Sequence, residues 1–414
     1  MVNFGETWVH VSPRALDLAH RAPRLGVSSL FQTMRMRRLS ITVSLFLLLP
    51  GYVGWRLLSG LSLGPVAIAA CIVLLIGCCL FVPFSMRTRA LRNRKLADRL
   101  AWVGLTAMGF FSSLFVLTLL RDVVLLGAYL FLPGGQARFW VEPSAQATLY
   151  LSLFVTLAGL IIARRRPGVV EIKIPVVDLP HALHGFSIAQ ISDVHVGPTI
   201  KRGFVEGVVR RVNELKADMI AVTGDLVDGS VQQLSAHTAP LAGLTARHGA
   251  YFVTGNHEYY SGERAWTEEI RRLGLRVLKN EHVVLQHDGA SLILAGVTDY
   301  SAHHFDPAQR SDPAAALHGA PIDAGARVLL AHQPSSAMAA ANAGFDVQIS
   351  GHTHGGQFWP WNLFIHFFQP FSSGLHRLKN LWIYVSRGTG YWGPPNRFGV
   401  PSEITRIRLV PATP

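Results

Sequence analysis

Residues 186–195 read FSIAQISDVH, an apolar run of strand-forming residues that ends in an aspartate and, two positions later, a histidine. Residues 218–225, DMIAVTGD, repeat this plan with another apolar run that ends in an aspartate. A helical stretch near 201–216 separates the two runs. Buried strands that alternate with helices are typical of an α/β sheet. The pattern therefore predicts an α/β domain in this half of the chain.

The same alternation continues toward the end of the chain. A helix is expected near 263–273, between the third strand and the fourth. The remaining strands are expected in AYFVTGN (250–256), LILAGVTD (292–299), RVLLAHQP (327–334), VQISGHTH (347–354), LWIYVSRG (381–388) and ITRIRLV (404–410). Strand ends in open α/β sheets converge on a crevice, so polar residues at these ends are expected to meet.

Nearly every predicted strand ends in a side chain that can bind a metal ion. The donors are Asp193, His195, Asp225, Asn256, His332, His352 and His354. Seven donors exceed what one tetrahedral ion needs, and they suit two ions that share a bridging carboxylate. A set of oxygen and imidazole donors without thiolate favours Mn, Fe, Zn or Co. We therefore expect two divalent metal ions, of which the sequence does not identify the element.

The first part of the chain is much more apolar than this domain. Half of all residues are hydrophobic and only 15% are charged, and residues 40–163 hold most of the apolar excess. Membrane spans are expected at about 40–59, 64–84, 100–120 and 146–163, because each approaches the roughly 20 residues that cross a bilayer. The apolar run 123–132 is too short to cross and is interpreted as interfacial or re-entrant.

These patterns divide the chain into three parts. We expect a basic N-terminal tail over 1–34, a multi-pass helical membrane domain over 35–166 and the α/β domain over 167–414. All three cysteines lie inside one apolar span, so the α/β domain has neither a disulfide nor a thiolate metal site.

The net charge of +13 is concentrated at the predicted span ends. Arginines precede the first span, fill the 85–99 loop and end the membrane region at 164–166. Basic residues at span ends are the signal that orients membrane proteins, and here they predict a cytoplasmic α/β domain. This placement makes nucleic acid an unexpected partner and membrane lipids expected ones.

Five short motifs follow one another in a fixed order: DVH (193–195), GDLVD (224–228), GNHE (255–258), the single His332 and GHTH (351–354). In order and residue type they resemble the motifs of calcineurin-like metallophosphoesterases, over roughly residues 186–410. The resemblance implies a four-layer αββα sandwich of two mixed sheets flanked by helices. It also implies two ligand sets that share one carboxylate, namely Asp193, His195, Asp225 and His354 for one ion and Asp225, Asn256, His332 and His352 for the other.

The resemblance further implies a reaction, the hydrolysis of a phosphate ester or pyrophosphate by metal-activated hydroxide. His257 resembles the general acid that protonates the leaving oxygen. Asp228 matches the carboxylate that orients this histidine, although an aspartate in a turn is as commonly a cap. Gly229 stands where the related protein phosphatases have an arginine, which argues against a phosphoprotein substrate.

Two closing segments resemble a narrower bacterial branch. GVTD (296–299) and SRGTGYWGPPNRFGVPSEI (386–404) are similar to blocks of membrane-associated enzymes like the UDP-2,3-diacylglucosamine diphosphatases of lipid A synthesis. This likeness implies the bacterial inner membrane as the location. Arg387 and Arg397 are candidate ligands of substrate phosphate, or basic residues with a structural or solvated role.

Glycines flank His352 and His354, and they are expected to let the backbone approach substrate closely. An aromatic run begins four residues beyond His354. One interpretation is a loop packed on its own domain. The other is a lipid-contacting patch, because tryptophan is favoured at the headgroup level. The candidate lipid-contact residues are Trp359, Trp361, Phe364, Phe367 and Phe368.

Three functions are compatible with these features. The first is a membrane-anchored dimetal phosphoesterase that acts on a lipid-linked substrate such as a UDP-diacylglucosamine-like glycolipid. The second is a phosphodiesterase for a soluble substrate, with the helices as anchor only. The third, a non-catalytic membrane scaffold, is disfavoured because no metal donor is missing. The oligomeric state is not predicted.

Overall fold

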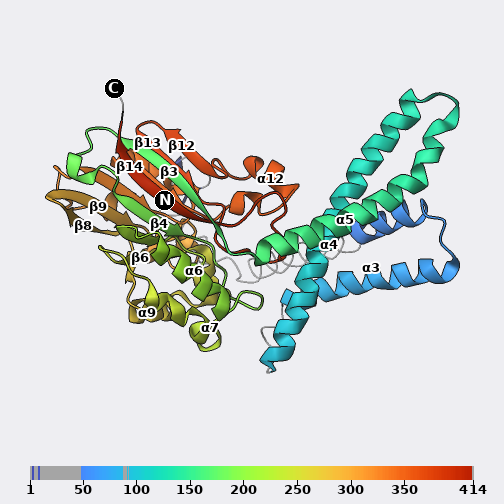
Figure 1. The fold of residues 1–414 in the computed structure, drawn as a ribbon, viewed down its shortest axis with the longest axis horizontal. Coiled ribbons are helices and arrows are strands. Elements are labelled where there is room, and N and C mark those ends of the chain that lie inside the picture. The colour runs from blue at the N-terminus through green and yellow to red at the C-terminus, as the bar shows by residue number, and fades with distance from the viewer. Residues whose placement is uncertain (1, 4–7, 10–47, 87–90, 92, 413–414) are drawn as a thin grey trace.

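The structure is a computed structural model that describes residues 2–3, 8–9, 48–86, 91 and 93–412 (Figure 1). Two short strands, β1 (Val2–Asn3) and β2 (Trp8–Val9), pair in antiparallel fashion. The rest of the predicted basic tail, and the first part of the first predicted span, lie outside the described residues.

Two six-stranded sheets form the C-terminal domain. One contains β3 (Gly168–Val176), β4 (Ser187–Ile191), β5 (Met219–Val222), β6 (Ala250–Phe252), β7 (Arg276–Val277) and β14 (Glu403–Pro411). The other contains β8 (Glu281–His287), β9 (Ala290–Gly296), β10 (Ala326–Leu330), β11 (Val347–Ser350), β12 (Gly374–Leu378) and β13 (Leu381–Val385). Their orders are β3-β14-β4-β5-β6-β7 and β12-β13-β11-β10-β9-β8, and both mix parallel with antiparallel pairs.

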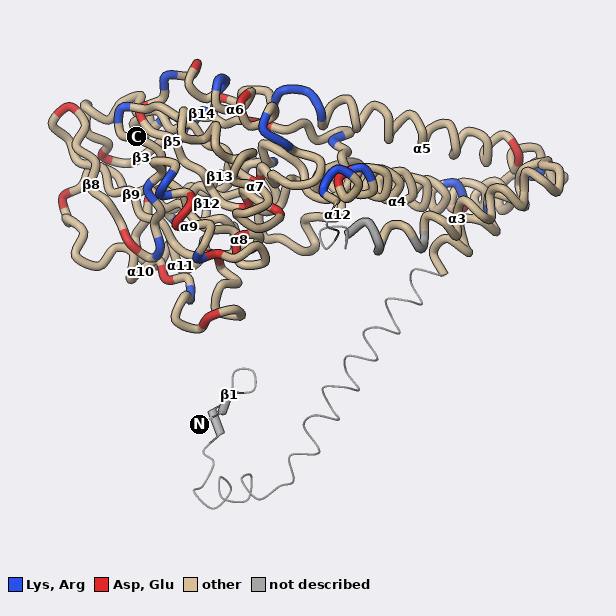
Figure 2. The backbone as a smooth tube through the Cα atoms, turned by 90° about the horizontal axis from the view of Figure 1, so that it is seen from below, with Lys and Arg blue, Asp and Glu red and all other residues tan. Residues whose placement is uncertain are grey.

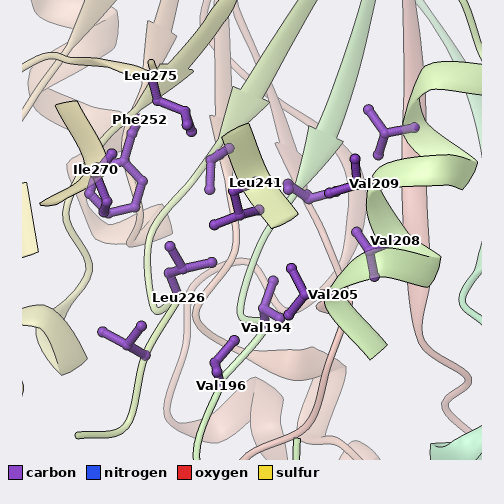
Figure 3. Packing of buried hydrophobic residues seen from close by; sticks show 14 of the residues in the cluster. Val194, Val196, Val205, Val208, Val209, Leu226, Leu241, Phe252, Ile270 and Leu275 are labelled. Carbon is purple, nitrogen blue, oxygen red and sulfur yellow. The ribbon is translucent and has the colours of Figure 1, made fainter. Parts of the chain in front are cut away.

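Hydrophobic clusters show how the layers stack. One cluster joins Ile188 and Met219 of the first sheet to Leu292 and Val347 of the second, so the sheets pack face to face. On the outer face of the first sheet, α6 (Arg202–Glu214), α7 (Val231–Thr238) and α9 (Glu263–Arg272) bury valines, Leu234 and Trp266. Figure 3 shows part of this cluster, including Val205 of α6 and Ile270 of α9. On the outer face of the second lie α10 (Pro313–Ala316) and α11 (Ala337–Ala343). The predicted α/β domain with mixed sheets is confirmed.

The strands that the sequence analysis missed share one position. β3, β7, β8 and β12 are the outermost strands of the two sheets. Edge strands are covered less completely than central ones, and β8 alternates exposed with buried residues. They therefore lack the continuous apolar runs by which the central strands were recognised.

The apolar N-terminal part is helical. Residues 48–58 form a helix, followed by α3 (Pro65–Met86), α4 (Arg94–Phe131) and α5 (Val141–Arg164), with a short turn of helix, η2 (Pro133–Trp140), between the last two. Among the described residues only two helices, Arg94–Phe131 and Pro133–Arg164, are long and apolar enough to cross a membrane, judged by length and composition. The multi-pass region of four spans is therefore not confirmed.

The run 123–132 is not a separate re-entrant element. It continues α4, which extends without interruption over 38 residues, or about 57 Å at 1.5 Å per residue. This length exceeds the roughly 30 Å of a hydrocarbon core. The first turns of α4 lie against the α/β domain, where Asp98 pairs with Lys201 at 3.0 Å.

The helical part contains charged residues that contact one another. The guanidinium of Arg56 contacts both carboxylate oxygens of Asp122, at 2.7 and 2.8 Å, and Tyr52 donates to the same carboxylate at 2.6 Å. The buried Arg121 donates to the carbonyls of Arg56 and Val141. Long stretches of α5 nevertheless carry no charged residue (Figure 2). Arg56, Arg121 and Asp122 thus satisfy one another or the backbone, which offsets the cost of removing charge from water.

Candidate dimetal site

Five loops bring the predicted donors together at one edge of the two sheets. Asp193 and His195 follow β4, and Asp225 follows β5. Asn256 begins α8 (Asn256–Ser261) after β6, while His332 follows β10 and His352 and His354 follow β11. β4, β5 and β6 run parallel, as do β10 and β11, so their carboxyl ends meet.

The first group of donors contains Asp193, His195 and His354, whose candidate ligand atoms all lie within 4.8 Å of one another. Nε2 of His195 lies 3.0 Å from Nε2 of His354, which in turn lies 3.5 Å from Oδ1 of Asp193. All three side chains are buried. Two imidazole nitrogens and a carboxylate that converge in this way match the first predicted ligand set.

The second group contains Asp225, His332 and His352. Nε2 of His332 lies 3.1 Å from Oδ2 of Asp225 and 3.2 Å from Nδ1 of His352. Nδ1 of His332 lies 2.8 Å from the carbonyl oxygen of Thr223, to which it can donate. This bond leaves a lone pair on Nε2, the arrangement that a metal-binding histidine requires.

An unsatisfied buried atom tests whether cations fit here. The amide oxygen of Asn256 is buried and has no hydrogen-bond partner among the described residues. Buried polar atoms are rarely left unpaired, so an unpaired acceptor beside histidines and aspartates suits a bound cation. Oδ2 of Asp225 lies 3.9 Å from Nε2 of His195 and 3.1 Å from Nε2 of His332, between the two groups. The donor set therefore fits two divalent ions with Asp225 as the shared ligand.

The backbone at the donors is unusual. Asp193, His195, Asp225, His352 and His354 all have φ between 50° and 74°. Non-glycine residues seldom adopt this left-handed conformation, and each such residue costs of order 1–3 kcal/mol. Strain of this kind clusters where function holds it in place. Its presence at five of the seven donors agrees with a binding site.

Gly351 has a different role from the one that the sequence suggested. A Cβ at this position would overlap Oγ of Ser192 and a carboxylate oxygen of Asp193. The backbone amide of the next residue, His352, donates to both carboxylate oxygens of Asp193, at 3.0 and 3.1 Å. The missing side chain therefore lets two ligand loops approach each other.

His257 and Asp228 form a hydrogen-bonded pair at the border of the site. Nδ1 of His257 lies 2.6 Å from Oδ1 of Asp228, while Nε2 points toward Oδ2 of Asp225 at 3.9 Å. Burial alone would lower the pKa of His257, but the hydrogen bond to Asp228 and the charges of Asp225 and Asp228 raise that pKa to about 9. An imidazolium held in this way has a proton available for transfer.

Glu258 is a structural residue that the sequence analysis did not single out. Its buried carboxylate accepts from the backbone amides of Asp225, Leu226 and Gly255, at 3.0, 2.8 and 2.7 Å. It thereby ties the loop after β5 to the loop after β6. A glutamate at the third position of a helix is a recognisable capping signal, so GNHE already held this information.

A cavity of about 310 Å³ opens beside His257. Its lining includes His195, Asp228 and His257, together with the exposed Tyr260 and Trp392. Three residues of α4, namely Ala101, Leu105 and Met108, also line it. No sequence pattern had indicated that a helix from the apolar part of the chain borders the candidate site.

The two arginines predicted to bind substrate phosphate differ in placement. Arg387 is partly exposed and pairs with Glu403 at 2.5 Å, and its role stays a prediction. Arg397 is fully buried, and its guanidinium donates to backbone carbonyls of Gly390 and Arg387. A side chain enclosed in this way does not meet substrate, so we correct the expectation for Arg397.

The aromatic run divides into a packed part and an exposed part. Phe358 is buried, and Trp361 of α12 (Trp361–Phe364) donates from Nε1 to Oγ of Ser112 on α4 at 2.8 Å. Phe367 and Phe368 are 80% and 79% exposed. The exposed aromatics thus stand on a segment that contacts a candidate membrane helix, close to α4 in Figure 1.

Comparison with known proteins connects this geometry to a family. Residues 186–356 match the family described as calcineurin-like phosphoesterase. A "Transmembrane protein with metallophosphoesterase domain" of Danio rerio is 38% identical over 274 residues, which cover 64% of this chain and 62% of that protein. The chain thus spans about three fifths of the length of such animal relatives.

Bacterial relatives are matched over more of their length. A metallophosphoesterase of Campylobacter jejuni is 30% identical over 263 residues, covering 63% of this chain and 68% of the relative. A metallophosphoesterase of Aquifex aeolicus is 32% identical over 225 residues, covering 54% of this chain and 84% of the relative.

Proposed function

Because the chain belongs to the calcineurin-like metallophosphoesterases, we propose that it is a membrane-anchored hydrolase that cleaves a phosphoric ester bond in a lipid-linked substrate. The hydrolytic part of the proposal rests on the two donor groups and on Asp225, whose Oδ2 lies between them. Two divalent cations bound there would acidify a water molecule and offset charge on the phosphoryl oxygens.

His257 and Asp228 are proposed to supply the proton to the leaving group. His257 is the proposed general acid, because its Nε2 faces the donor groups and its raised pKa keeps it protonated at neutral pH. Asp228 orients the ring through Nδ1. The leaving oxygen would therefore depart into the cavity that His257 borders.

That cavity is the observation that carries the lipid-linked part of the proposal. The apolar side chains Leu105 and Met108 of α4 form a wall of the cavity that His257 also lines. Water-soluble alcohols gain little from such a wall, whereas an acyl or prenyl chain would bury apolar surface, at about 25 cal/mol per Å². The leaving group is thus proposed to be the apolar part of the substrate.

Two further features support a substrate that arrives from a bilayer. The wall belongs to a helix that is long and apolar enough to span a membrane. The exposed Phe364, Phe367 and Phe368 form a candidate headgroup-level contact beside that helix, together with Trp359 and Trp361. The arginines at the span ends place the catalytic domain, in this proposal, on the cytoplasmic side.

The narrower likeness to UDP-2,3-diacylglucosamine diphosphatases stays a prediction, as does a bacterial inner-membrane location. The relatives include animal transmembrane proteins as well as bacterial ones, and their names point to no lipid A enzyme. The general class, an ester or pyrophosphate of a lipid alcohol, does not depend on that likeness.

The proposal is tested with the purified full chain, loaded with Mn²⁺ in detergent micelles. Two nucleoside-diphosphate lipids with one headgroup are compared, one with long acyl chains and the other with acetyl groups. We expect kcat/KM to be at least tenfold higher for the long-chain substrate. Equal values for both would favour the alternative, a phosphodiesterase of soluble substrates with the helices as anchor, and absence of any turnover on either would contradict the hydrolytic proposal.

A further inference from the structure

We propose that the helical hairpin of α4 and α5 helps to position one ligand of the metal site. Segment 394–398 packs on this hairpin, and Arg397 within the segment contacts the donor His354. Arg397 is thereby a positioning residue for one of the two ions. The inference rests on the proposed function only in taking His354 as a metal ligand.

The hairpin side of this connection is unusually close. The backbone amide of Arg397 donates to the carbonyl of Gly159 on α5 at 3.1 Å, although that carbonyl lies inside a helix. A methyl group at Gly159 would overlap the side-chain amide of Asn396. A methyl group at Gly109 on α4 would lie 3.2 Å from Cβ of Pro394. The segment thus packs against a glycine on each of the two helices.

An aromatic contact also packs segment 394–398 against α5. The ring of Phe398 meets Phe154 of α5 edge-to-face, with 6.1 Å between ring centres. Phe398 also accepts, through its carbonyl, the backbone amide of Trp359 at 2.8 Å. The segment is therefore fixed between α5 and the loop that follows the GHTH motif.

The site side of the connection is the guanidinium of Arg397. Nη2 lies 2.9 Å from Nδ1 of His354, and Nη1 lies 3.3 Å from the carbonyl oxygen of the same residue. The guanidinium also donates to the carbonyls of Gly390 and Arg387. A guanidinium has no acceptor, so Nδ1 of His354 accepts and Nε2 faces His195.

This arrangement leaves Arg397 little freedom. The side chain is completely buried, so a donor that lost its partner would be costly to leave unpaired. A shift of the segment on the hairpin would move the guanidinium and, with it, the ring of His354. In this tautomer Nε2 of His354 carries the proton, and a bound cation would replace that proton. The position of the ring therefore affects the affinity for the cation.

The consequence is specific to one ion. His354 belongs to the group with Asp193 and His195, whereas His332 and His352 form the other group with Asp225. Arg397 makes no hydrogen bond to His332 or His352 among the described residues. A change in the packing of segment 394–398 on the hairpin should therefore weaken binding of the first ion and leave binding of the second unchanged.

The decisive variant is Gly159→Ala in the full chain, with Gly127→Ala as its matched control. Gly127 is another helical glycine, and a methyl group there would meet nothing within 4 Å. Both changes raise helix propensity equally, by about 1 kcal/mol. The double variant Gly159→Ala/Asn396→Ala removes the overlapping amide and tests whether the steric contact is the cause.

Mn²⁺ binding to the metal-free protein in micelles is measured by calorimetry, together with its thermal midpoint. We expect the wild type to bind Mn²⁺ at two sites. In Gly159→Ala the affinity of the first site should fall roughly tenfold to a hundredfold, as it does when residues that hydrogen-bond to a metal ligand are changed. Gly127→Ala should bind as the wild type does. The double variant should recover most of the lost affinity. Phe154→Ala, which removes only the ring contact, provides a milder change if Gly159→Ala fails to fold, and should also weaken one site alone.

Three outcomes would overturn the inference: unchanged affinity in a folded Gly159→Ala, equal weakening of both sites, or no recovery in the double variant. Binding of no Mn²⁺ by the wild type would instead contradict the proposed dimetal function itself. The two failures are therefore distinguishable.

Discussion

Oδ1 of Asp228 lies 2.6 Å from Nδ1 of His257, and Oδ2 of the same carboxylate lies 3.4 Å from Nδ1 of His195. One carboxylate thus touches both the proposed general acid and a candidate metal ligand. These contacts hold the pKa of Asp228 low, although burial alone would raise it. Asp228 therefore stays ionised and keeps a proton on the facing nitrogen of His257.

Asp228→Asn should lower kcat and move the alkaline limb of its pH profile. The pKa of His257 is raised to about 9, so its acid form is present below that pH and is lost as the pH rises through it. Removing the carboxylate should shift this loss toward the ordinary histidine value of about 6.5. Bound cations would lower the pKa of His257 in both proteins, so the difference between their pH profiles would remain.

The measurement is kcat against pH for the Mn²⁺-loaded full chain. We expect a fall of about tenfold to a hundredfold at pH 8, less than the roughly 10²–10⁴-fold that a general acid contributes. His257→Ala, in contrast, should lose the limb altogether. An unchanged limb in Asp228→Asn would show that this carboxylate does not control the acid.

Asp225→Asn should remove metal binding and turnover while the fold is retained. The carboxylate lies between both donor groups, so an amide in its place loses the charge that both cations share. We expect kcat to fall by more than about 10³-fold, with loss of Mn²⁺ by elemental analysis. Asp288→Asn is the control, because among the described residues this exposed side chain forms ion pairs only with Arg247 and His287, and the variant should behave as wild type.

Glu258→Gln should destabilise the domain. The carboxylate accepts from three buried amides, and a glutamine would turn an N–H group toward at least one of them. Burial and the charge of Asp225 raise the pKa of Glu258 to about 8, so this carboxylate is mostly charged only above that pH. Above it, we expect the free energy of unfolding of the metal-free chain to fall by about 2 kcal/mol, in the range for hydrogen bonds to a charged group. Chemical denaturation measures this loss. Glu268→Gln on the exposed face of α9 should change it little.

The central fold and the donors were predictable because both rest on local patterns. β4, β5, β10 and β11 are buried on both faces, so each reads as an apolar run, and the donor follows directly in sequence. Edge strands such as β8 escaped because exposed and buried positions alternate there. The order of motifs then identified the family, which no single histidine could have done.

What could not be predicted depends on contacts between distant segments. Leu105 lies in an apolar run that reads as a membrane span, and nothing in that run shows that it faces His257, some 150 residues later. Arg397 stands in a loop where a basic residue is usually solvated, and only the fold encloses it. The extent of α4 was missed because an apolar run of about ten residues does not reveal that it continues a helix.

Leu105→Gln should separate recognition of the lipid chain from chemistry. Leu105 lines the cavity that His257 also lines, and it is not one of the donors, so a polar side chain there removes apolar contact without replacing a donor. We expect KM for the long-chain substrate to rise about tenfold, since losing the burial of one leucine costs roughly 1.5–3 kcal/mol, while kcat on a water-soluble diester stays unchanged. Val103→Gln is the matched control, because Val103 is 61% exposed on another face of α4. Equal KM values for Leu105→Gln and wild type would show that the α4 wall does not bind the substrate.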